Sequence, residues 1–148
     1  MALAEVAAGG GDREERASRI AEIIRSAGAY RWVGLYDVTD AEIGIIAWSG
    51  AGPPAHPRFP RASGLSGVAA ATGETVVAND VASDPRYLET FGDTRAEVVV
   101  PVSVDGVVRG TVDVESASAD VFDAVEQVFL EECAAAALPL WSERGPLG

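Results

Sequence analysis

The feature that most constrains the fold is a pair of apolar strands joined by a two-residue turn. Residues 97–104 and 107–115 are rich in valine, and Asp105-Gly106 lies between them. β-Branched residues favour strands, and Asp-Gly between two such runs is a strong signal for a tight hairpin. The sequence therefore predicts an antiparallel hairpin in the second half of the chain.

Two further strands and a helix precede this hairpin. Residues 31–38 and 42–48 contain strand-forming residues on either side of a short polar gap, which suits a second hairpin. A helix is expected over 12–27, with Asp12 as its N-cap and an apolar face at Ile20, Ile23, Ile24 and Ala27. That face either packs on the domain's own sheet or forms a seam with a second copy of the chain.

The middle and the end of the chain contain shorter elements. Four prolines fall within the segment Gly50–Gly64, which is expected to be an irregular loop that covers a pocket. A short helix over 65–72 and a brief strand over 75–78 follow it. A last helix is expected to start at the N-cap Asp120 and to end before Pro139, with an apolar stripe at Phe122, Val125, Phe129, Cys133 and Ala136.

The order of these elements predicts an α+β fold. An antiparallel sheet would carry the N- and C-terminal helices on one face and a loop-covered pocket on the other. The expected organisation is a disordered segment over 1–11, a single domain over 12–138 and a C-terminal tail over 139–148.

Composition narrows the classes of function. The net charge of −12 argues against a nucleic-acid partner, because phosphate binding needs clustered Lys and Arg. The sequence contains no apolar run long enough to cross a bilayer and no signal-peptide pattern. A single cysteine excludes an internal disulfide and fits a reducing compartment, so a cytoplasmic location is expected.

Several motifs together resemble a GAF domain over residues 12–138. They are Trp32-Val33-Gly34-Leu35-Tyr36, Gly64-Leu65-Ser66-Gly67, Glu97-Val98-Val99-Val100-Pro101 with Asp105-Gly106, and Gly110-Thr111-Val112-Asp113-Val114-Glu115-Ser116. More narrowly, the chain is similar to the branch that contains free methionine-R-sulfoxide reductase. That resemblance implies a small-molecule pocket, and in the reductases it implies three cysteines around it.

This sequence has no cysteine at the positions that the resemblance implies. They fall on His56, Ser66 and Thr90. Reduction of a sulfoxide by this route needs an attacking thiolate and a second thiol that resolves the intermediate. The remaining thiol, Cys133, lies on the core stripe of the last helix and is expected to be an inert packed side chain. The sequence therefore predicts a protein without cysteine redox activity, and no catalytic residue is assigned.

The acidic residues that hold the substrate's amino group in the family do have counterparts. The resemblance places them at Glu97 and Asp113, with Glu115 where the family more often has Asp. Such carboxylates hold an ammonium group through charge-assisted hydrogen bonds. The alternative is that Glu97 reaches water at a strand edge and that Asp113 and Glu115 lie on the solvated face of a half-buried sheet.

The hairpin itself raises a geometric question about this pair. If Asp105-Gly106 is a strict two-residue loop, Glu97 lies opposite Val114, and Glu97 and Asp113 point to opposite faces of the sheet. A bulge near Pro101 or Gly110 would add one residue and bring both carboxylates to the same face. The sequence leaves both arrangements open.

Other candidate ligand contacts carry less information. Ser66 either caps the short helix or contacts a ligand, and His56 reads as a surface residue because no second metal ligand accompanies it. Three aromatic residues are candidate pocket walls or core residues: Trp48, Phe59 and Tyr87. No motif for a metal or an organic cofactor is present, so none is expected.

Three functions follow as alternatives. The leading prediction is a small-molecule-binding sensor or regulatory module for an amine or amino-acid-like ligand, which works as a homodimer or with a separate signalling partner. The second is a free methionine-R-sulfoxide reductase, an oxidoreductase. The third is a dimerisation module without a ligand.

Overall fold

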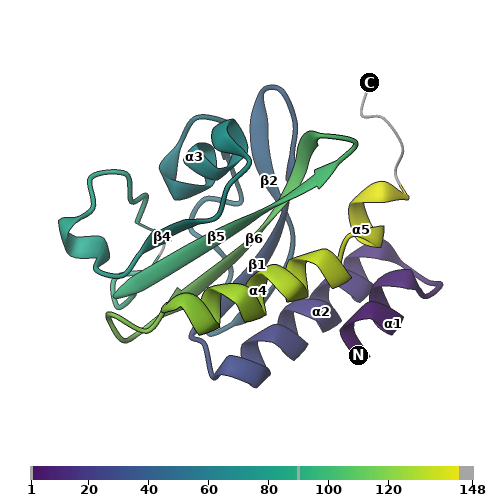
Figure 1. Ribbon diagram of the computed structural model, residues 1–148, viewed down its shortest axis with the longest axis horizontal. Helices are drawn as coiled ribbons and strands as arrows, with labels where there is room; N and C mark the ends of the chain where they lie inside the picture. The colour runs from purple at the N-terminus through teal and green to yellow at the C-terminus, as the bar shows by residue number, and fades with distance from the viewer. Residues whose placement is uncertain (1, 90, 144–148) are drawn as a thin grey trace.

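One curved antiparallel sheet forms the centre of the molecule (Figure 1). The computed structural model describes residues 2–89 and 91–143, and the strands of the sheet lie in the order β3-β2-β1-β6-β5-β4. Their bounds are Trp32–Val38 for β1, Glu42–Gly50 for β2, Arg58–Pro60 for β3, Val76–Ala78 for β4, Ala96–Val104 for β5 and Val107–Ser116 for β6. The prediction of an α+β fold with an antiparallel sheet is confirmed.

Four α-helices cover one face of the sheet and a fifth lies on the other (Figure 1). The first group comprises α1 (Ala2–Ala8), α2 (Arg13–Gly28), α4 (Ala124–Ala136) and α5 (Pro139–Ser142). Helix α3 (Gly64–Thr72) packs near β4, β5 and β6 on the opposite face. Within the described residues, no helix combines the length and the apolar composition that crossing a bilayer requires.

Helix α2 packs its apolar face against the sheet of its own chain. Asp12 caps the helix, because its carboxylate accepts a hydrogen bond from the backbone N–H of Glu14 at 3.2 Å. Ile20 and Ile24 are fully buried in the core between the helices and the sheet. Of the two uses that the sequence left open for this face, the structure shows packing within the domain.

The hairpin between β5 and β6 forms as predicted from its turn residues. Val104 pairs with Val107 across Asp105 and Gly106, whose φ angles are 52° and 80°. Positive φ at both central residues is the backbone geometry of the turn that matches the twist of two paired strands. Gly adopts it freely and Asp tolerates it, which explains why these two residues occupy the turn.

A bulge interrupts this hairpin two residues after the turn. Val102 pairs with Gly110 while Ser103 pairs with Val108, so Arg109 is an extra residue on β6. One extra residue reverses the side-chain phase of everything beyond it. The bulge thus lies next to Gly110, one of the two places that the sequence left open.

The N-terminal segment departs from the prediction of a disordered 1–11. Residues 2–8 form helix α1, with Leu3 and Ala7 buried in the helix-side core. Arg16 of α2 fixes this helix by donating a hydrogen bond to the carbonyl oxygen of Ala7 at 2.7 Å. The expectation was wrong because the Ala- and Gly-rich composition has a weak helical pattern, and the packing that orders it is tertiary.

Leu3→Ala tests whether α1 belongs to the cooperative core. Because Leu3 is 1% exposed, its truncation should lower the free energy of unfolding by about 2 kcal/mol. Urea denaturation followed by circular dichroism measures this. Glu5→Ala, on the exposed side of the same helix, serves as the control and should change it by less than about 0.5 kcal/mol. Equal effects from both substitutions would show that α1 is not packed.

Two other boundaries differ from the prediction. The loop Gly50–Gly64 contains strand β3, in which Phe59 pairs with Ile43. The strand accommodates Pro60 because it lies at the edge of the sheet. Helix α4 is capped by Asp123, which accepts from the N–H of Glu126, and not by Asp120. Val125, in the first turn of this helix, is exposed to solvent and is not part of the core stripe.

The segment predicted as a tail also contains structure. Pro139 begins helix α5 in place of ending the helical region. Leu140 and Trp141 are buried, and the indole Nε1–H of Trp141 donates a hydrogen bond to the backbone oxygen of Tyr36 at 3.1 Å. The tail's residues 144–148 lie outside the described residues.

Candidate functional site

Three buried carboxyl groups meet on the sheet face opposite the four helices. Because of the bulge, Glu97 pairs with Glu115 and Val99 pairs with Asp113, so all three acidic residues project to the same side. One oxygen from each carboxyl group lies within 4.8 Å of the other two. Glu97 and Asp113 are each 5% exposed and Glu115 is fully buried. The alternative of a solvated sheet face is therefore wrong for these residues.

A small cavity lies over Glu97 and Asp113. Its other walls come from β1, the segment 56–66 and the irregular segment after β4, namely Tyr36, His56, Phe59, Ser63, Gly64, Leu65, Ser66 and Leu88. The free space inside is about 20 Å³, enough for about one water molecule. The site is thus a small, partly enclosed pocket with a carboxyl floor.

Burial and mutual repulsion govern the ionisation of these groups. Loss of hydration raises the pKa of Glu97 well above its ordinary value, and the nearby Asp113 raises it further. Burial also raises the pKa of Asp113 to about 6, while a hydrogen bond from Glu97 opposes this shift. The proton is therefore held on Glu97, which donates it in a hydrogen bond to the Asp113 carboxylate.

The hydrogen-bonding of the cluster is incomplete. Thr94 donates from its hydroxyl to one oxygen of Glu115 at 2.7 Å. In contrast, the Oδ1 atom of Asp113 is buried and has no hydrogen-bond partner among the described residues. No arginine in the described part of the chain forms an ion pair with Glu97 or Asp113. A buried anionic oxygen without a partner costs free energy, so the site is poised to accept a cation.

Tyr36 forms the β1 side of the pocket. It pairs with Thr111 on β6, and its phenol is almost fully buried. Burial raises the pKa of Tyr36, and the neighbouring carboxyl groups of Asp113, Glu115 and Glu97 raise it further. The phenol therefore stays neutral and serves as a wall, and its ring packs edge-on against Phe59 with centroids 5.8 Å apart.

The structure brings together some of the residues predicted from the sequence. His56, Ser66 and Phe59 line the cavity beside Glu97 and Asp113, and Glu115 belongs to the carboxyl cluster. Trp48 and Tyr87 instead pack against apolar clusters and do not line the cavity. Thr90, the third position implied for a cysteine, lies outside the described residues.

Sequence reasoning missed several contributors to the site. Tyr36, Leu65 and Leu88 line the cavity, and Thr94 binds Glu115. Alternation along 32–38 could have placed Tyr36 on the same face as Trp32, but its position beside Asp113 depends on the pairing of β1 with β6. The other three lie in short or irregular segments without a periodic signal.

Cys133 is separated from this site by the sheet. It lies on α4 in the helix-side core, where it is almost fully buried. Burial raises the pKa of its thiol to about 11, so very little thiolate forms at neutral pH. The prediction of a packed thiol agrees with this placement.

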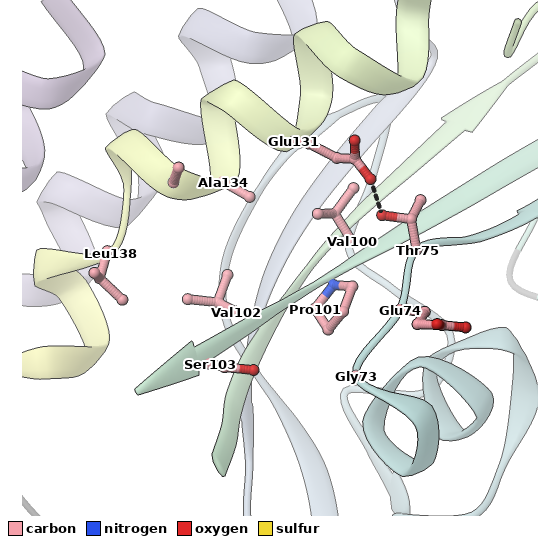
Figure 2. Close-up of a pocket in the computed structure, with 11 residues that line it drawn as sticks. Gly73, Glu74, Thr75, Val100, Pro101, Val102, Ser103, Glu131, Ala134 and Leu138 are labelled. Atoms are coloured by element: carbon pink, nitrogen blue, oxygen red, sulfur yellow. Dashed lines mark hydrogen bonds between the residues drawn. The ribbon is translucent and has the colours of Figure 1, made fainter. Parts of the chain in front are cut away.

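A wider groove lies elsewhere, between α4 and the outer edge of β5 (Figure 2). Its volume is about 550 Å³, and it runs along Pro101, Val102 and Ser103 toward Leu138. The polar side chains here are already satisfied or open to solvent: Thr75 donates to Glu131 at 2.6 Å, as Figure 2 shows. This groove has more free space than the carboxyl pocket, but the unsatisfied buried carboxylate makes the smaller pocket the better candidate site.

The carboxyl cluster has two chemical uses. Three oxygens at these separations can surround an ammonium group, which offers three N–H donors. Oxygen ligands at such separations also suit a hard divalent cation such as Ca²⁺ or Mg²⁺. The apolar and aromatic residues above the carboxyl floor favour the ammonium ligand over the metal ion. They provide walls for the organic part of such a ligand, and a metal ion has no organic part.

A family model and curated relatives match this chain. A family model described as GAF domain matches residues 11–138. The free methionine-R-sulfoxide reductase of Saccharomyces cerevisiae is 36% identical over 106 residues, which cover 70% of this chain and 58% of the yeast protein. The chain spans only 58–63% of the length of the curated relatives it matches.

Solved structures show the same similarity. The free methionine-R-sulfoxide reductase of Neisseria meningitidis, determined in complex with its substrate, is 30% identical with a TM-score of 0.85; the match covers 95% of this chain and 84% of that one. The type II enzyme of Thermoplasma acidophilum is 28% identical with a TM-score of 0.82, over 89% of this chain and 96% of that one.

Proposed function

Because the chain belongs to the GAF domain family, we propose that it is a ligand-binding module whose carboxyl pocket takes an organic ammonium group. The observation that carries the proposal is the buried Asp113 carboxylate, which has an unpartnered Oδ1 atom and no ion pair among the described residues. An amine or amino-acid-like ligand would supply the missing donors and the missing positive charge. The relatives named free methionine-R-sulfoxide reductases, whose named substrate is an amino acid, support this ligand class.

The proposed ligand would be held at both ends. Its ammonium group would lie between Glu97 and Asp113, where a charged donor lowers the free energy of the carboxylate form. Its organic body would contact Phe59 and the ring of Tyr36. Leu88 would close the pocket from the side of the irregular segment.

Ligand entry requires the pocket to open, because the free space of about 20 Å³ is smaller than any amino acid. The exposed residues 55–57 carry His56 into the wall, and they lie before the edge strand β3. We propose that this part of the predicted lid Gly50–Gly64 moves outward for entry and closes over the ligand. Differential affinity for the open and closed forms is what a sensor would transmit.

A thermal-shift panel tests the proposal. Free amino acids, primary amines, cyclic nucleotides and divalent cations are added in excess at pH 7.5, where the Asp113 carboxylate is mostly ionised. A ligand at about 100 times its dissociation constant should stabilise the protein by about 2.7 kcal/mol. We expect amines or amino acids to raise the melting temperature. Stabilisation by divalent cations alone would show that the pocket binds a metal ion and not an amine. If no compound stabilised the protein, the result would favour a dimerisation module without a ligand.

The named relatives favour one second candidate, a sulfoxide reductase. Reducing a sulfoxide to a sulfide and water consumes two electrons, which a thiol pair supplies while it becomes a disulfide. This sequence contains one cysteine, and its thiol is buried on the far side of the sheet. A dithiothreitol-coupled assay on free methionine-R-sulfoxide should therefore show no turnover above the uncatalysed rate. Sustained turnover that Cys133→Ser abolishes would establish the reductase instead.

We place the module in the cytoplasm, where its cysteine stays reduced. A sensor also needs an output, which we assign to a homodimer or to a separate signalling partner. Size-exclusion chromatography with light scattering, with and without the stabilising compound, tests the dimer directly.

A further inference from the structure

A second hollow presents two arginines and lies beyond the bulge, away from the carboxyl pocket. Its volume is about 350 Å³, and it forms between the β1–β2 turn and the beginning of β6. The residues that line it are Val38, Thr39, Asp40, Ala41, Arg61, Val107, Val108 and Arg109. We propose that this hollow binds an anion, a carboxylate or phosphate group carried by a small molecule.

The bulge explains why a guanidinium points here. Arg109 is the extra residue of β6, and its Nε is buried without a hydrogen-bond partner among the described residues. A buried N–H without an acceptor costs free energy, and a bound oxyanion would remove that cost. Planar guanidinium groups bind carboxylates and phosphates through two parallel hydrogen bonds.

Arg61 is held in place by the backbone. Its guanidinium donates to the carbonyl oxygen of Thr39 at 3.0 Å and to that of Ala70 at 3.4 Å. These bonds fix the charge at the edge of the hollow without neutralising it. Such a preorganised cation binds an anion with little loss of side-chain freedom.

Neither arginine has a carboxylate partner among the described residues. Within residues 2–89 and 91–143, five other arginines form ion pairs, whereas Arg61 and Arg109 form none. Arg19, Arg25 and Arg95 also form no ion pair among the described residues, and what sets Arg61 and Arg109 apart is that both line the same hollow. The exposed Asp40 on the rim repels an anion, so removing its charge should strengthen anion binding.

An adjoining hollow suggests what the anion is attached to. It has a volume of about 620 Å³, shares Asp40, Ala41 and Arg61 with the first, and is otherwise lined by Pro60, Ala62, Gly67, Val68 and Ala71. Small apolar side chains predominate there. A ligand with a charged head and an apolar body would place its head at the arginines and its body on this surface.

The test uses NMR titration of the full chain with inorganic phosphate, phenyl phosphate and benzoate at constant ionic strength. The aromatic compounds should bind at least tenfold more tightly than inorganic phosphate, and the stronger of the two identifies the head group. Arg109→Gln and Arg61→Gln should each weaken binding about tenfold, and Asp40→Asn should strengthen it severalfold. Arg19→Gln, at an exposed arginine on α2, is the matched control and should change nothing.

The proposal is overturned if no anion gives saturable shifts at residues 38–41 and 107–109, or if Arg19→Gln weakens binding as much as Arg109→Gln. A folded Arg109→Lys variant, which keeps the charge but loses the paired donors, should bind more weakly than the native chain. Asp113→Asn should leave anion binding unchanged, so the outcome is independent of the amine pocket.

Discussion

Asp113→Asn is expected to weaken binding of an ammonium ligand about 100-fold, which corresponds to about 2.7 kcal/mol. The Asp113 carboxylate has a buried, unpartnered oxygen, so its charge is available to a ligand and is weakly screened by solvent. The amide has the same shape, but it lacks the charge that strengthens the hydrogen bond. Isothermal titration calorimetry with the compound that stabilises the protein most measures the loss.

The same substitution should stabilise the unliganded protein above pH 7. An amide removes the cost of burying a carboxylate whose pKa is raised, so the free energy of unfolding should increase. Asp105→Asn in the exposed hairpin turn is the matched control and should affect neither quantity. If Asp113→Asn destabilised the protein and left ligand affinity intact, Asp113 would be a structural residue.

The second large effect is a loss of stability with rising pH. Asp113 has a pKa of about 6 in the folded chain and an ordinary value of 3.8, so the folded state binds more protons between these values. The free energy of unfolding therefore falls as pH rises through this window, by about 3 kcal/mol. Glu97, whose pKa is raised further by burial and by Asp113, extends the fall to higher pH.

Denaturant titrations from pH 4 to pH 8 measure this dependence. The native chain should be most stable near the acidic end of the window, and Asp113→Asn should flatten the profile. A saturating ammonium ligand should restore stability at pH 8, because it favours the ionised carboxylates. A stability that rises steadily from pH 4 to pH 8 would show that the carboxyl groups are paired with cations in the folded state.

The sequence predicted the hairpin and its turn, but it could not place the bulge. Valine alternation and Asp105-Gly106 determine that β5 and β6 pair. The extra residue is Arg109, which has no special turn propensity, and its displacement depends on how the strands pack. One extra residue decides whether Glu97 and Asp113 project from the same face of the sheet. The position of that residue could not be predicted from the sequence, so the arrangement of the carboxyl groups could not be predicted either.

Local patterns also failed where tertiary packing decides. The sequence of helix α1 has a weak helical pattern, yet Leu3 and Ala7 are buried in the core between the helices and the sheet. Tyr36 reaches the carboxyl cluster because β1 pairs with β6, where its partner Thr111 is far away in the sequence. Trp48, Phe59 and Tyr87 were all candidates because they are aromatic, but of the three only Phe59 lines the pocket.

The central claim is that the carboxyl pocket recognises a positively charged nitrogen. The most direct measurement compares, by isothermal titration calorimetry at pH 7.5, the compound that stabilises the protein most with its N-acetyl derivative. Acetylation removes the positive charge and two of the three N–H donors while keeping the organic body. Our account predicts saturable binding of the free amine and at least a 100-fold loss on acetylation. Equal affinity for the two compounds would contradict it.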